Sequence, residues 1–202
     1  MFTKALIETL AADCQPTGDP ILDDLFVKYN GGSPRQDDPG YYRFLYALTK
    51  HFGQQKIPLT FIEVGCYSGA ASLHFLRGYD DPRAIAYGVD TTDQVKPVVK
   101  AANFRFTLGS SINQGIVQKF ENGLADIILI DTDHTYKTTA EEYRLWLPKL
   151  KLGGLMLFDD IDAPEYAAGC GKFFKELRGE KVSLPQLHPD NWGFGVWFHN
   201  KQ

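Results

Sequence analysis

The middle of the chain alternates short apolar runs with segments of helical periodicity. Five apolar runs have the length of buried strands; they cover Leu59–Val64, Ala84–Asp90, Phe104–Gly109, Asp126–Asp131 and Leu155–Asp160. The helices expected between and after them lie near Gly69–Leu76, Gln94–Ala101, Asn113–Phe120, Thr138–Leu150 and Pro164–Leu177. Two later strands are expected at Val182–Leu187 and Val196–His199. This alternation predicts a Rossmann-like, doubly wound α/β fold, with a mostly parallel seven-stranded sheet and helices on both faces.

The segment before the first strand has a helical pattern. Helices are expected within Phe2–Tyr29 and at Tyr41–Phe52, separated by a loop at Asn30–Gly40 that is dense in Gly, Pro and Asp. We therefore expect an N-terminal helical extension over residues 1–56 and a Rossmann-like domain over residues 57–202. The aromatic residues of the second helix suit a cap over a substrate, the interface of a homodimer or ordinary core packing, and the pattern does not choose among the three.

Composition and charge exclude several classes of protein. The 202 residues suit one domain, and the net charge of −4 without a run of Lys and Arg argues against a nucleic-acid partner. Cys14, Cys66 and Cys170 are too scattered for a zinc site or a disulfide framework, so reduced thiols are expected. No apolar run suggests a signal peptide or a membrane span, which favours a cytoplasmic protein without a membrane partner.

The predicted strands end in acids or in small residues. Because parallel strands bring their carboxyl ends to one rim, these residues are expected to lie close together; they are Glu63–Gly65, Asp90, Gly109–Ser111, Asp131–Asp133 and Asp159–Asp160. A single Asp in such a place is as well explained as a helix cap. Five polar strand ends on one rim favour a ligand site.

The first turn and the second strand end indicate a nucleoside ligand. Gly65 and Gly69 flank a turn into a helix, where free N–H groups and close backbone approach suit an anionic group. The turn is neither the G-x-G-x-x-G dinucleotide pattern nor a P-loop, and taken alone it is equally compatible with a tight structural turn. Asp90 ends the next strand, the place from which an acid reaches a ribose diol in nucleotide-binding folds.

Taken in order, the segments EVGCYSGAAS, YGVD, LGSS, LIDTDHTY and GGLMLFDD resemble class I S-adenosylmethionine-dependent methyltransferases. They are most similar to metal-dependent small-molecule O-methyltransferases of the catechol, caffeoyl-CoA and antibiotic-sugar types, and to methyltransferase domain 24. The resemblance implies that S-adenosylmethionine is the cofactor and that a small molecule with a hydroxyl group is the acceptor. The cofactor contacts that it implies are Glu63, Gly65, Tyr67, Ser68, Gly69, Ser72, Asp90, Ser110, Ser111 and Asp131.

Asp131, Asp159 and Asp160 match the three metal-binding positions of this family. Three carboxylates suit a hard cation such as Mg²⁺, which would make a bound hydroxyl more acidic. The alternative is that Asp159 and Asp160 cap the following helix. Asp133 or His134 is expected to be the general base: the resemblance favours Asp133, whereas the ordinary pKa of histidine, about 6.5, favours His134.

Two alternative functions remain at this point. A nucleotide-dependent oxidoreductase would use a similar sheet, although the dinucleotide pattern is absent. A non-catalytic domain could keep the S-adenosylmethionine pocket and lack turnover. An amino-directed nucleic-acid methyltransferase is disfavoured, because Asp131-Thr132-Asp133-His134 replaces the Asp/Asn-Pro-Pro-Tyr/Phe loop of those enzymes.

For the helix after the fourth strand, Thr138 with Glu141, or Thr139 with Glu142, has the spacing of a capping box.

Overall fold

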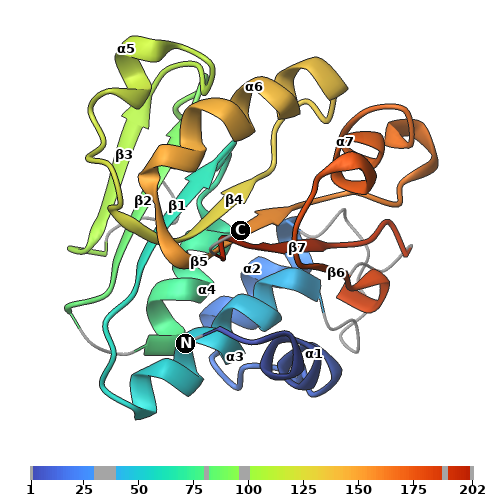
Figure 1. The fold of residues 1–202 in the computed structure, drawn as a ribbon. Coiled ribbons are helices and arrows are strands. Elements are labelled where there is room, and N and C mark those ends of the chain that lie inside the picture. The colour runs from blue at the N-terminus through green and yellow to red at the C-terminus, as the bar shows by residue number, and fades with distance from the viewer. Residues whose placement is uncertain (1, 30–39, 80–81, 96–100, 188–190, 201–202) are drawn as a thin grey trace.

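A seven-stranded sheet forms the centre of the protein (Figure 1). The computed structural model describes residues 2–29, 40–79, 82–95, 101–187 and 191–200. The strands are β1 (Thr60–Val64), β2 (Ile85–Asp90), β3 (Phe104–Leu108), β4 (Ala125–Ile130), β5 (Leu150–Phe158), β6 (Lys181–Ser183) and β7 (Gly195–Phe198). They lie in the order β3-β2-β1-β4-β5-β7-β6. The first five pair in parallel and β7 runs antiparallel to both of its neighbours, which confirms the predicted α/β fold.

The strand order reverses between β1 and β4. From β1 the chain moves outwards through β2 and β3, and it then returns to place β4 on the other side of β1. Both central strands are almost wholly buried, as their continuous apolar sequences predict. In such sheets a reversal opens a crevice at the carboxyl ends of the two strands, and ligands bind there.

Helices cover both faces of the sheet. One face packs against α1 (Lys4–Ala12), α3 (Gly40–Gln54) and α4 (Ala70–Tyr79), and α2 (Pro20–Tyr29) contacts α4. The other face packs against α5 (Gln114–Val117), α6 (Tyr136–Trp146) and α7 (Cys170–Glu176). Neighbouring strand residues serve opposite faces: Phe61 belongs to the first core cluster and Ile62 to the second. The division of the chain into residues 1–56 and 57–202 stays a prediction. Within the described residues, no helix is long and apolar enough to cross a membrane.

The helix α6 begins earlier than the sequence predicts. Thr135 is its N-cap, and the Thr135 hydroxyl accepts a hydrogen bond from the Thr138 N–H at 3.2 Å. The expected capping residues Thr138 and Thr139 therefore lie inside the helix, so the predicted capping box is wrong. The helix ends at Trp146, because Pro148 has no N–H group to continue it. A 3₁₀ turn, η1 (Leu147–Lys149), follows and leads directly into β5.

Four other segments differ from their predictions or lie outside the described residues. The helix expected over Pro164–Leu177 is a 3₁₀ turn, η2 (Pro164–Tyr166), followed by α7. The strand expected over Val182–Leu187 stops at Ser183, because Pro185 begins a further 3₁₀ turn, η3 (Pro185–Leu187). Gln94 and Val95 are not helical, and residues 96–100 lie outside the described residues, as does most of the predicted loop, at residues 30–39.

Candidate active site

A cavity of about 680 Å³ opens at the carboxyl ends of the parallel strands. The predicted site residues that line it are Gly65, Tyr67, Asp90, Ser110, Ser111, Asp131, Asp133 and Asp159. Other lining residues are Tyr41, Tyr42, Val89, Thr91, Gly109, Ile112, Thr132 and Thr138. The predicted residues that do not line it are Glu63, Ser68, Gly69, Ser72, His134 and Asp160. The strand ends thus meet at one cavity, and the other predicted site residues do not line it.

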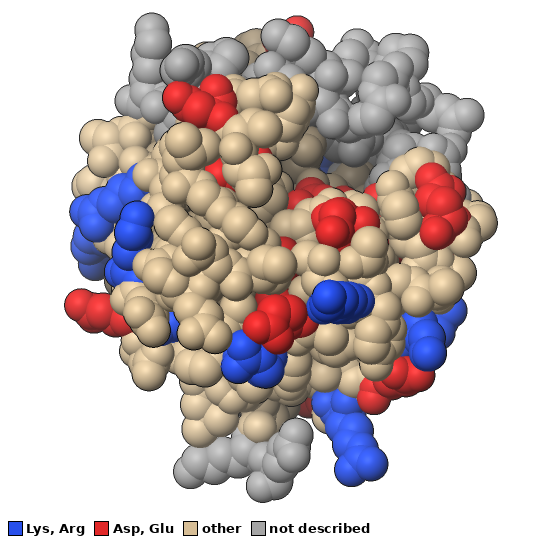
Figure 2. All heavy atoms as spheres, turned by 90° about the horizontal axis from the view of Figure 1, so that it is seen from above, with Lys and Arg blue, Asp and Glu red and all other residues tan. Residues whose placement is uncertain are grey.

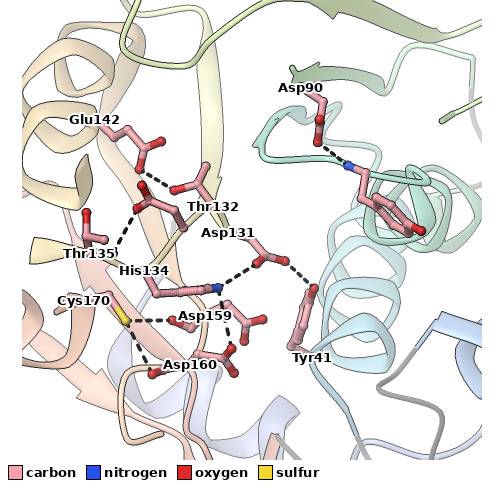
Figure 3. A network of polar contacts seen from close by, with 12 residues as sticks. Tyr41, Asp90, Asp131, Thr132, His134, Thr135, Glu142, Asp159, Asp160 and Cys170 are labelled. Atoms are coloured by element: carbon pink, nitrogen blue, oxygen red, sulfur yellow. Dashed lines mark hydrogen bonds and ion pairs between the residues drawn. The ribbon is translucent and has the colours of Figure 1, made fainter. Parts of the chain in front are cut away.

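The glycine turn after β1 packs directly against the end of β4. Gly65 has a φ of +87°, and a Cβ atom there would lie 1.7 Å from the backbone oxygen of Asp131. No other residue type fits this contact. Tyr67 is also in the left-handed region, with a φ of 40°. Its N–H group donates to Asp90 Oδ2 at 2.7 Å, so the turn is tied to the end of β2 (Figure 3).

Glu63 stabilises the turn from below. Its buried carboxyl group accepts hydrogen bonds from the N–H, at 3.0 Å, and from the hydroxyl of Ser72 at the start of α4. Burial raises the pKa of Glu63 to about 8, although the Ser72 hydroxyl lowers it and the charge of Asp131 raises it. Ser68 is buried as well. These groups hold strand, turn and helix together next to the cavity.

Asp90 is organised by the backbone around it. Besides the bond from Tyr67, Asp90 Oδ1 accepts from the N–H and the hydroxyl of Thr92 at 2.8 and 2.9 Å. A carboxylate has about four lone-pair sites. Three protein donors therefore fix the orientation of the group and leave capacity for a ligand in the cavity.

The acids after β4 and β5 surround one imidazole ring (Figure 3). His134 Nε2 lies 3.7 Å from Asp131 Oδ1 and 3.7 Å from Asp160 Oδ2. The ring stacks on Tyr166 with a centroid distance of 4.5 Å. His134 and Asp160 each have a φ of 56°, so the backbone turns sharply at both positions. The other oxygen of Asp131 accepts a hydrogen bond from the Tyr41 hydroxyl at 2.9 Å.

This group of acids carries an excess of negative charge. Asp159 and Asp160 are both 7% exposed. Burial raises the pKa of Asp159 well above its ordinary value, and Asp131 and Asp160 raise it further. Burial also raises the pKa of Asp160 to about 7. Asp159 Oδ1 is buried and has no hydrogen-bond partner among the described residues. Figure 2, the view from above, shows Asp and Glu atoms gathered around a hollow of the surface.

The donor chemistry of Asp131, Asp159 and Asp160 fits a hard cation, because an orphaned buried oxygen and mutual repulsion both favour one. The spacing is less complete. Within the described residues, no three or more His, Cys, Asp or Glu side chains are placed so that they could hold a metal ion. The imidazole of His134 occupies the space between two of the three carboxylates. The metal site therefore stays a prediction.

The two candidate bases have different surroundings. Asp133 lines the cavity, and its carboxylate accepts from the Thr135 N–H at 3.0 Å and from the Thr138 hydroxyl at 2.9 Å. It thereby also stabilises the start of α6. His134 lies behind the cavity wall and faces the carboxylates.

Two residues of this region were not among the predicted site residues. Tyr41, at the start of α3, lines the cavity, and its ring stacks on Phe194 at 4.9 Å. Glu142 on α6 is fully buried and accepts hydrogen bonds from Ser111 and Thr132. The sequence holds one signal for Glu142: helical spacing places it on the same face as Thr139 and Trp146, which makes it an acid on a buried face.

A family model described as a methyltransferase domain matches residues 62–161. Residues 62–161 are a methyltransferase domain. Every residue predicted for the site, from Glu63 to Asp160, lies inside this methyltransferase domain. The match covers the sheet from β1 to β5, including both strands at which the order reverses.

The methyltransferase domain has relatives among curated proteins. The chain is 23% identical over 174 residues to an uncharacterized protein of Acanthamoeba polyphaga mimivirus, covering 76% of this chain and 77% of that protein. It is 28% identical over 82 residues to an uncharacterized protein of Sinorhizobium fredii, covering 41% of this chain. The chain spans only 9% of the length of the latter protein.

Solved structures share the fold of the methyltransferase domain. An O-methyltransferase from Bacillus cereus in complex with SAH has a TM-score of 0.65 at 14% identity, covering 95% of this chain and 96% of that chain. The SAH-bound Podospora anserina methyltransferase PaMTH1 has a TM-score of 0.61 at 17% identity, covering 98% and 97%. The MycE methyltransferase of the mycinamycin pathway, in complex with Mg and SAH, has a TM-score of 0.57 at 20% identity, covering 89% of this chain and 55% of that chain.

Proposed function

We propose that this methyltransferase domain transfers the methyl group of S-adenosylmethionine to a hydroxyl group of a small molecule, assisted by a divalent cation such as Mg²⁺. One observation carries the proposal: a single cavity is lined by Asp90 at the end of β2 and by Asp131 and Asp159 after β4 and β5. Two similar structures hold SAH and a third holds Mg with SAH, which supports the proposed cofactor and the proposed cation.

In the cofactor part, each residue has a role that follows from its contacts. Gly65 lets the turn pack against the Asp131 backbone, which a Cβ atom would prevent, and this packing places the turn beside the methionine moiety. The oriented carboxylate of Asp90 accepts from the ribose hydroxyls. Glu63 does not line the cavity, and it supports the turn from behind through its hydrogen bonds with Ser72. Ser110 and Ser111 line the cavity after β3, beside the adenine ring in this proposal.

In the acceptor part, the reaction is a direct displacement. The bond between sulfur and the methyl carbon breaks as the bond between the acceptor oxygen and that carbon forms, and the hydroxyl proton passes to a base. Asp133 and His134 are the two candidates for that base. A cation held by Asp131, Asp159 and Asp160 would lower the pKa of the acceptor hydroxyl. Tyr41 and the cavity wall hold the reactants in line, and positioning of this kind supplies much of the acceleration in such transfers.

Isothermal titration with S-adenosylmethionine and with SAH, in the presence and absence of Mg²⁺, tests the cofactor part. Incubation with a metabolite pool and S-adenosylmethionine, followed by mass spectrometry for products that have gained one CH₂, tests the transfer. The Asp90→Asn variant is expected to bind SAH at least tenfold more weakly. The Asp160→Ala variant is expected to bind SAH normally and to lose metal-dependent turnover.

The exposed residue Glu121 provides the matched control, because Glu121→Gln removes an acid that does not line the cavity. Absence of SAH binding by the unaltered protein would refute the proposal. Binding of SAH without any methylated product would instead favour a non-catalytic cofactor-binding domain. Equal loss of SAH binding in the Asp160→Ala and Asp90→Asn variants would contradict the division of the cavity into two parts.

A further inference from the structure

One buried carboxylate joins two walls of the cavity without lining it. Glu142 Oε1 accepts a hydrogen bond from the Ser111 hydroxyl at 2.5 Å, and Glu142 Oε2 accepts one from the Thr132 hydroxyl at 2.9 Å (Figure 3 shows the second). Ser111 follows β3 and Thr132 follows β4, and both line the cavity. Glu142 itself is 0% exposed. It can therefore act on a ligand only through these two side chains.

The two hydrogen bonds determine what the hydroxyl groups offer to a ligand. A hydroxyl has one hydrogen and two lone pairs, whereas an ionised carboxylate can only accept. Since both hydrogens are directed to Glu142, the Ser111 and Thr132 oxygens have only lone pairs to offer to the cavity. The backbone of Ser111 is held in place, because its carbonyl oxygen accepts a hydrogen bond from Trp146 Nε1 at 3.0 Å.

We propose that Glu142 is a positioning residue that makes this wall of the cavity a hydrogen-bond acceptor, selective for a purine that carries an exocyclic amino group. The inference rests on the proposed function, in which Ser111 lies beside the adenine of the cofactor. The amino group of adenine donates two hydrogens, which match the lone pairs. A purine with a carbonyl oxygen at the same position, as in hypoxanthine, would place lone pairs against lone pairs. A buried group left unpaired in this way is costly.

The state of Glu142 sets the conditions for the test. Burial raises its pKa to about 7, the hydrogen bonds from Ser111 and Thr132 lower it, and the charges of Asp133 and Asp131 raise it. Measurements at pH ~8.5 therefore keep Glu142 ionised. The probes are SAH and S-inosylhomocysteine, in which a carbonyl oxygen replaces the amino group and N1 gains a hydrogen. The readout is the ratio of their dissociation constants by isothermal titration, compared between the unaltered protein and each variant.

The unaltered protein is expected to prefer SAH by roughly tenfold to a hundredfold, the ratio that one unsatisfied buried polar group produces. In Glu142→Gln the side-chain amide donates to one hydroxyl and releases that hydroxyl's hydrogen for a carbonyl. The ratio should fall to about threefold or less, chiefly because S-inosylhomocysteine binds more tightly. The neighbouring Glu141→Gln is the matched control: Glu141 pairs with Arg144 on the exposed side of α6, and its removal should leave the ratio unchanged.

Glu142→Gln with an unchanged ratio, both ligands weakening equally, would show a merely structural role and overturn the inference. Ser111→Ala keeps the test decisive if Glu142→Gln does not fold, because loss of one acceptor should weaken SAH while leaving S-inosylhomocysteine nearly unaffected. An unchanged ratio in Ser111→Ala would also overturn it. If the unaltered protein bound neither ligand, the proposed function would fail together with this inference. Binding of SAH with an unchanged ratio in the variants would overturn this inference alone.

Discussion

The replacement Glu63→Gln tests whether the buried acid beneath the glycine turn makes stability depend on pH. An acid whose pKa is higher in the folded than in the unfolded protein stabilises the fold below its unfolded pKa, and this contribution is lost as the pH rises through the folded value. For Glu63 the window runs from 4.5 to about 8. At about 1.4 kcal/mol for each step of one in pKa, the full loss is on the order of 5 kcal/mol.

The assay is urea unfolding between pH ~5 and pH ~8.5, followed by the fluorescence of Trp146 and Trp197, which are 0% and 3% exposed. The unaltered protein should lose stability across this range, and Glu63→Gln should lose several kcal/mol less. The other buried acids titrate in both proteins, so their contributions cancel in the comparison apart from their coupling to Glu63, in which Asp131 is the largest partner. Glu121→Gln, at an exposed position, should follow the unaltered protein. Parallel curves for the unaltered protein and Glu63→Gln, within about 0.5 kcal/mol at every pH, would refute the reasoning.

Two further replacements probe the cavity. Tyr41→Phe removes the hydroxyl that donates to Asp131, and a hydrogen bond to a carboxylate is worth about 1.5–3 kcal/mol. The kcat/KM should therefore fall about tenfold to a hundredfold, while the Kd for SAH changes less than threefold. Unchanged kinetics would contradict this role. Gly65→Ala should weaken SAH binding more than tenfold and lower Tm, because the new methyl group meets Asp131. The control is Gly123→Ala, at a φ of +64° with nothing within 4 Å of the new atom, which should lower stability by only about 1–2 kcal/mol and leave SAH binding unchanged. Equal effects of the two replacements would argue against a packing role for Gly65.

The sheet and most of the cavity follow from local patterns. Each central strand can be predicted from a short apolar run, and parallel pairing then brings the carboxyl ends of these strands to the same edge of the sheet. For this reason Asp90, Asp131 and Asp159 could be placed at one site before any coordinates were known. Their placement needs only strand order and direction, not the packing of individual side chains.

Contacts that depend on the rotation of a helix could not be predicted in this way. The hydrogen bond between Tyr41 and Asp131 joins residues 90 positions apart, and it exists because α3 packs at one particular angle on the sheet. Glu142 reaches Ser111 for a similar reason. At the start of α6, Thr135, Thr138 and Thr139 have the same capping propensity, and the choice of Thr135 follows from the loop that Asp133 shapes. The predicted bases are likewise separated by side-chain orientation, which places Asp133 at the cavity and His134 behind it.

Three residues, one in the glycine turn and two in the acidic part, keep a backbone conformation that glycine adopts more readily. Tyr67, His134 and Asp160 have φ values of 40°, 56° and 56°. Each costs roughly 1–2 kcal/mol relative to glycine. Selection for the reaction would keep these residues despite their conformational free-energy cost. In a lineage that had lost the reaction, mutation would replace them with residues that adopt a positive φ more easily. Glycine or asparagine at positions 67, 134 and 160 would therefore mark pseudoenzyme descendants of this protein in genome sequences.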